Sequence, residues 1–112
     1  MSDGLWVKEL PISITVCDAQ GIIIEMNEKS CQVFEKRGGR ELIGDNVLDC
    51  HPEKAGKKIK EIMESQTINC YITERNGVKR MVYQSPWYQE GKYRGIVEFI
   101  MELPNEVQCL KR

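Results

Sequence analysis

The chain has 112 residues, a length that supports one domain and leaves no room for a second hydrophobic core. Hydrophobic residues make up 41% and charged residues 29%, which is ordinary globular usage and excludes a disordered or fibrous chain. The 16 basic and 17 acidic residues give a formal net charge of -1, so charge gives no reason to expect nucleic acid or an anionic membrane as a partner.

The sequence favours a cytoplasmic protein with reduced thiols. No apolar run approaches the roughly 20 residues of a membrane-spanning helix, and the opening MSDGLWVKELP lacks the apolar stretch of a signal peptide. The five cysteines are an odd number without any CxxC spacing. We therefore expect neither a disulfide framework nor a compact zinc or iron–sulfur site.

The first segments predict a cap and a hairpin. Residues 1–10 carry the apolar anchors Leu5 and Trp6 and predict a cap segment or a short helix. The β-branched run ISITVC and the turn residues DAQG at 18–21 then predict a two-stranded unit over 12–26.

Two helices are predicted next, with a broken segment between them. Asn27 is a good N-cap for a helix of two to three turns that presents Cys31 and Phe34 on one face and ends at Gly38 and Gly39. RELIGDNVLD, which follows, predicts a single turn and a loop.

A longer helix is predicted over 52–65, because Pro52 suits a first helical position. Its apolar residues form one stripe: Ala55, Ile59, Ile62 and Met63. Its lysine-rich side is either a solvated surface or a docking surface.

The remaining chain predicts three strands. Asn76-Gly77 between the runs TINCYITE and VKRMVYQSPWY is a strong hairpin signal, and Pro86 is expected at a strand edge or bulge. EGKYRG is expected to turn the chain into GIVEFIMEL. In this last run Val97 and Phe99 alternate with Glu98, which predicts one fully apolar sheet face and one partly polar face.

The order of these elements predicts an α+β domain, with an antiparallel sheet and its helices on one face. Three segments resemble the PAS domain (the sensory-box fold) over about residues 8–103: VCDAQGIIIEMN, GGRELIGDNVLDCHPE and PWYQEGKYRGIVEFIMEL. The resemblance implies a five-stranded antiparallel sheet in the order 2-1-5-4-3, with the helix at 52–65 over it. We divide the chain into a cap (1–10), a PAS-like sensor domain (11–103) and a tail (104–112).

The resemblance also implies a function. PAS domains are sensory or interaction modules with a pocket between sheet and helices and an outer sheet face that pairs with another copy. The family's D-I-T signal for an output helix is replaced here by MELP, which fits a stand-alone PAS protein or one excised from a larger sensor.

Cys50 and His51 are the residues with the clearest potential for redox or metal chemistry. His51, the only histidine, is a candidate haem or metal ligand by resemblance to haem-binding PAS domains, or else it caps the helix or lies at the surface. Cys50 is a candidate redox thiol at a helix N-terminus, or an inert cysteine. A covalent flavin adduct is not expected, because Val47 stands where the light-sensing subfamily has its reactive cysteine.

We therefore expect a cytoplasmic signalling module that binds a small apolar or amphipathic molecule and acts on a partner protein or effector domain. The residues expected to line the pocket are Ile14, Val16, Cys31, Phe34, Ile59, Ile62, Met63, Val97 and Phe99. The alternatives are a ligand-free dimerisation or interaction module, with Leu5 and Trp6 at a homodimer interface, and a haem sensor that uses His51. We do not expect an enzyme, because the sequence has no phosphate-binding glycine loop and no Ser/His/Asp set.

Overall fold

The computed structural model describes residues 4–48 and 53–112. Its strands form one antiparallel sheet in the spatial order β2-β1-β5-β4-β3, which confirms the predicted fold class and strand order. The strands are β1 (Ser13–Asp18), β2 (Ile23–Met26), β3 (Asn69–Arg75), β4 (Val78–Gln89) and β5 (Lys92–Glu102). The helical elements are α1 (Leu5–Lys8), α2 (Glu28–Val33), the 3-10 turns η1 (Glu35–Arg37) and η2 (Gly39–Leu42), and α3 (Glu53–Ser65).

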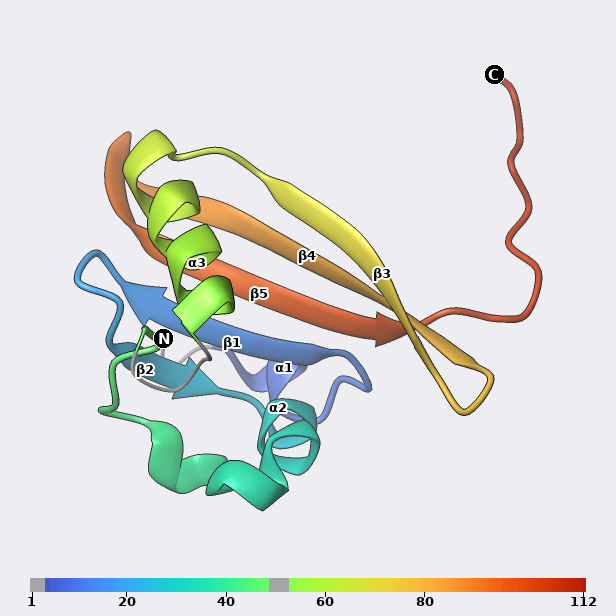
Figure 1. Ribbon diagram of the computed structural model, residues 1–112, viewed down its shortest axis with the longest axis horizontal. Helices are drawn as coiled ribbons and strands as arrows, with labels where there is room; N and C mark the ends of the chain where they lie inside the picture. Colours follow the sequence, from blue (N-terminus) through green and yellow to red (C-terminus); the bar gives the residue numbers. More distant parts are fainter. Residues whose placement is uncertain (1–3, 49–52) are drawn as a thin grey trace.

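The helices lie on both sides of the sheet (Figure 1). Helix α3 crosses in front of it, whereas α1 lies behind β1. The hairpin of β3 and β4 runs out beyond the helices, and the residues after β5 extend away from the sheet. We call the sheet face toward α3 the inner face and the opposite face the outer face.

Two-residue turns join the last three strands. Asn76 and Gly77 have φ angles of 52° and 79°, the left-handed values that a tight hairpin requires, so the predicted turn is confirmed. The second hairpin turns at Glu90 and Gly91, with φ of 53° and 78°. EGKYRG is therefore only partly a turn, and β5 begins at Lys92.

Pro86 lies in β4 opposite Ile96 of β5, beyond the last pair between β3 and β4, which joins Asn69 to Gln84. At Pro86 the strand therefore has a neighbour on one side only, which is the edge environment expected for a residue without an amide hydrogen.

Asn27 connects three elements. As predicted, it caps α2: its Oδ1 accepts a hydrogen bond from the Ser30 amide at 3.0 Å. The same oxygen accepts from the Ile14 amide at 3.0 Å, and its Nδ2 donates to the carbonyls of Val7 and Ile12, each at 2.8 Å. Asn27 is only 7% exposed, so one buried amide joins α1, β1 and α2.

Helix α2 is shorter than predicted. Helix α2 has six residues rather than two to three turns, and η1 follows it before Gly38 and Gly39 reverse the chain with φ of 124° and 55°. The buried core then forms between the inner face and the helical layer, from Cys17, Ile23, Met26, Leu42, Ile62 and Ile96.

The strand register corrects part of the predicted pocket. Residues directly opposite in an antiparallel pair share a face, and the register places Thr15 opposite Glu98 and Glu98 opposite Gln84. These three side chains line a small space together with Ile59 of α3, so they lie on the inner face. The alternate positions lie on the outer face and do not face α3: Ile14, Val16, Val97 and Phe99.

Strands β5 and β1 approach closely at Gly95. This glycine has a φ of 147°, and a Cβ atom placed on it would collide with the backbone of Cys17 and Asp18. Trp87 lies opposite Gly95 in β4, and its indole Nε1 donates a hydrogen bond to the Cys17 carbonyl at 2.9 Å. The missing side chain thus lets three strands come together at one point.

Candidate functional site

Among the residues that the structure describes, little space is left beside Ile59, between α3 and the sheet. Ile59 and Ile62 are 5% and 3% exposed, and the space beside Ile59 has a volume of about 30 Å³. That volume holds about one water molecule. The predicted pocket residues Cys31, Phe34 and Met63 are half-buried and pack against the same core.

A much larger groove lies next to this core, between α2–η1 and the inner face of β3, β4 and β5. Two adjoining hollows, of about 690 and 510 Å³, form it. Both are lined by Val33, Lys36, Arg75, Val82 and Ile100. We call this the α2–β3 groove, and it is the candidate functional site.

The groove has an apolar floor and a polar inner end. Val82, which is 5% exposed, and Ile100 come from the sheet, and Phe34 comes from the end of α2. Beside them, side chains cross three strands in one hydrogen-bonded row. Asn69 Nδ2 donates to Gln84 Oε1 at 2.9 Å, and Gln84 Nε2 donates to Glu98 Oε2 at 2.7 Å.

Tyr71 of β3 adds a phenol to this groove. Burial, and then the nearby Glu98 carboxylate, raise the pKa of Tyr71 above its ordinary value of 10.0. The phenol therefore keeps its proton at neutral pH and is available as a hydrogen-bond donor.

Cations dominate the rim. The charged residues that line the two hollows are Lys29, Lys36, Arg37, Arg75 and Arg80 among the cations, and Glu35 and Glu98 among the carboxylates. Arg80 lies 3.4 Å from the Glu102 carboxylate in an exposed ion pair.

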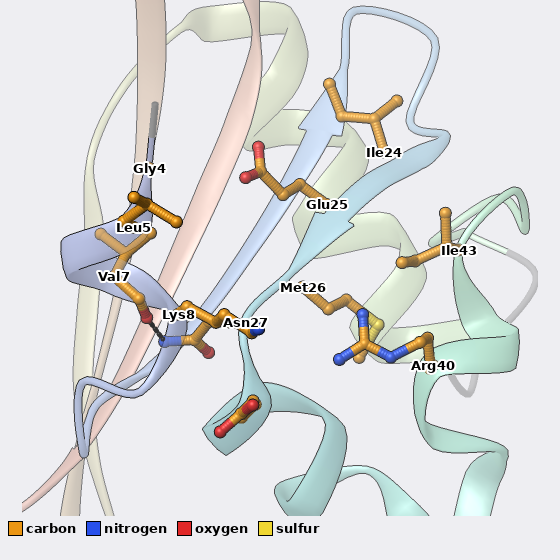
Figure 2. A pocket seen from close by; sticks show the side chains of 11 residues that line it. Gly4, Leu5, Val7, Lys8, Ile24, Glu25, Met26, Asn27, Arg40 and Ile43 are labelled. Carbon is orange, nitrogen blue, oxygen red and sulfur yellow. Dashed lines mark hydrogen bonds between the residues drawn. The ribbon is translucent and has the colours of Figure 1, made fainter. Parts of the chain in front are cut away.

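A second, smaller groove of about 290 Å³ lies at the other edge of the sheet. Helix α1 supplies Leu5 and Lys8 to one wall, η2 and the residue after it supply Arg40 and Ile43 to the other, and β2 runs between them (Figure 2). Figure 2 also shows the hydrogen bond from Asn27 to the Val7 carbonyl beside this groove.

Five of the groove residues, Lys36, Tyr71, Arg75, Val82 and Ile100, were not predicted as site residues, although Phe34 was. Their signal in the sequence is the pair Ile96 and Ile100 on the nominally polar side of the last strand. Those two isoleucines, four residues apart, mark the inner face.

Cys50 and His51 lie outside the described residues, so the redox and haem hypotheses stay predictions. Within residues 4–48 and 53–112, no three His, Cys, Asp or Glu side chains gather as a metal site would require. In that same part of the chain, no helix has the length and apolar content of a membrane crossing.

No family model matches the chain, and no curated protein does either. Solved structures do. The C-terminal domain of a Streptococcus mutans protein superposes with a TM-score of 0.73 at 22% identity, over 88% of this chain and 80% of that one.

Two further structures are PAS domains by name. One, from Colwellia psychrerythraea, has a TM-score of 0.66 at 19% identity and covers 91% of this chain and 94% of that one. The other, from the histidine kinase ThkA, has a TM-score of 0.65 at 19% identity and covers 80% of this chain and 97% of that one. Together with the strand order, these likenesses show that the chain has the PAS fold.

Proposed function

We propose that this chain is a cytoplasmic, non-catalytic sensory module that binds a small molecule in the α2–β3 groove and acts on a partner protein or effector domain. The observation that carries the proposal is the groove itself. Its two hollows, of about 690 and 510 Å³, lie in the usual size range of ligand pockets, roughly 300–1,000 Å³. Its apolar floor offers contact area to a ligand, and the charged and polar side chains of its rim offer groups that can fix the ligand's orientation. The named histidine kinase ThkA, whose PAS domain is similar in fold, supports a signalling role.

Filling the groove is expected to abolish ligand binding. Val33 lines both hollows, so Val33→Trp places an indole inside the site. We expect a compound from a panel of amphipathic metabolites to raise the thermal midpoint of the unsubstituted protein by about 10 °C at 100 times its Kd, and to leave Val33→Trp unshifted. Differential scanning fluorimetry measures both.

Val107→Trp is the matched control, because Val107 is exposed in the tail and lines neither hollow. The control should respond as the unsubstituted protein does. A panel without any hit, or a hit that shifts Val33→Trp equally, would contradict binding in the groove.

The second candidate function is that of a homodimer, and the outer face favours it. Tyr83 and Phe99 form a tilted ring pair there, with centroids 6.5 Å apart. Next to the sheet, Leu5 and Trp6 of α1 are 79% and 74% exposed. Large apolar side chains at such exposure are typical of a surface that a partner covers. We propose that α1 and the outer face pair with a second copy.

The double substitution Leu5→Glu/Trp6→Glu is expected to raise the dimer dissociation constant at least about tenfold, because it places carboxylates in an apolar contact. Sedimentation velocity over a concentration series measures this constant. Leu110→Glu, in the exposed tail, is the control and should leave it unchanged. A monomeric unsubstituted protein at tens of micromolar would rule out the dimer.

A further inference from the structure

The α2–β3 groove differs in charge from the rest of the chain. Five cationic side chains and only two carboxylates line its two hollows, whereas the whole chain has 16 basic and 17 acidic residues. The local excess of positive charge is therefore a property of this site and does not follow from composition.

Part of the charge in the groove is already compensated. Arg80 is paired with Glu102, and Glu98 accepts a hydrogen bond from Gln84. Three cations differ from these. In the part of the chain that the structure describes, Lys29, Lys36 and Arg75 have no carboxylate within ion-pair distance. A ligand is a natural source of the missing negative charge.

The unpaired cations lie beside apolar surface. Lys36 and Arg75 line both hollows, and so do Val82 and Ile100 from the floor. A guanidinium binds a carboxylate through two parallel hydrogen bonds, and such charge-assisted bonds are about twice as strong as neutral ones. The protonated phenol of Tyr71 lines only the smaller hollow, near Glu98, and is a donor at the polar inner end of the groove.

We propose that the groove selects an organic anion, a molecule with a carboxylate head that Arg75 and Lys36 bind and an apolar body that covers Val82 and Ile100. This inference rests on the proposed ligand-binding function and names the chemical class of the ligand. A cationic ligand would face the rim cations, and a neutral one would leave them unpaired.

Glu98 sets the direction in which the ligand lies. Its carboxylate lies at the polar inner end of the groove, bonded to Gln84, and lines only the smaller hollow. Arg75 lies in the β3–β4 hairpin and lines both hollows. The anionic head therefore belongs at the Arg75 end, away from Glu98.

Three probes with one eight-carbon chain test the proposal: octanoate, octan-1-ol and octylammonium, each titrated calorimetrically at pH 7.5. We expect octanoate to bind at least about tenfold more tightly than octanol, and octylammonium to bind more weakly than either. Added sodium chloride should weaken octanoate binding and leave octanol binding unchanged, because salt screens only the charged contact.

Two double variants, each of which removes two positive charges, test whether the preference for octanoate arises in the groove. Lys36→Gln/Arg75→Gln should bind octanoate no more tightly than octanol, and its unchanged affinity for octanol would show that it is folded. Lys57→Gln/Lys60→Gln removes two exposed lysines of α3, neither of which lines the groove, and should keep the tenfold preference.

The outcomes separate the two levels of the proposal. Equal affinity for octanoate and octanol, tighter binding of octylammonium, or loss of the preference in the α3 variant overturns the choice of an anion and leaves a ligand groove in place. Absence of binding by all three probes, or equal binding by Val33→Trp, overturns the ligand-binding function as well.

Discussion

Gly95→Ala is expected to lower the free energy of unfolding by about 4 kcal/mol, or to prevent folding altogether. Any Cβ at this position collides with the backbone of Cys17 and Asp18, and backbone cannot move aside as a flexible side chain does. The φ of 147° adds strain for every residue except glycine. Relief of the collision would separate β5 from β1 and break the bond from Trp87 to Cys17.

Urea unfolding followed by tryptophan fluorescence measures this loss. Gly91→Ala is the matched control, because Gly91 also has a positive φ, 78°, but a Cβ there meets nothing within 4 Å. The control isolates backbone strain, at about 1 kcal/mol. Similar losses for the two variants would show that the close approach at Gly95 does not matter.

Asn27→Ala is expected to cost about 3 kcal/mol of unfolding free energy. The substitution removes four hydrogen bonds at once and leaves their backbone partners in a place where Asn27 itself was 7% exposed. Loss of the N-cap alone accounts for about 1 kcal/mol of this. Chemical denaturation gives the total.

Asn27→Asp separates the two halves of the junction. An aspartate keeps the acceptor for the amides of Ile14 and Ser30 but loses the donor to the carbonyls of Val7 and Ile12. We expect α1 to detach while α2 stays capped, seen as faster hydrogen exchange at the Leu10 amide, which bonds to Val7. Unchanged exchange at Leu10 would contradict the role of Asn27 in holding α1.

Much of the fold is predictable from the sequence because its signals are local. Asn76-Gly77 specifies a tight turn through the φ values that both residues tolerate, and Asn27 specifies a helix start through its own side chain. The strand order depends on contacts between distant segments, so no local signal specifies it. It was predicted only because three segments resemble the PAS domain in the same order along the chain.

The assignment of sheet faces could not be predicted correctly, for a physical reason. Glu98 and Gln84 look like solvent-facing residues, yet they lie on the inner face, where hydrogen bonds between them and to Asn69 satisfy their polar groups. The alternation of apolar and polar residues along a strand predicts that such polar side chains are exposed to solvent. The apolar alternation through Val97 and Phe99 then marks the outer face, whereas α2 and α3 lie on the inner face.

The α2–β3 groove was unpredictable because no single segment encodes it. It exists where α2 is shorter than its pattern predicts and where the β3–β4 hairpin extends beyond the helices (Figure 1). Lys36 and Arg75 look like ordinary surface residues in the sequence. Only the packing of η1 opposite β3 brings them to one site.

The pairing of β1 with β5 has a consequence for the order of folding. The β1–β2 hairpin and the meander of β3, β4 and β5 each form from neighbouring segments, whereas the β1–β5 pairing closes a loop of about 80 residues. Contacts so distant along the chain form slowly, because loop entropy must be lost before they contribute. The two hairpin units should therefore fold early, with the β1–β5 seam, including the close approach at Gly95, completed in the slowest step.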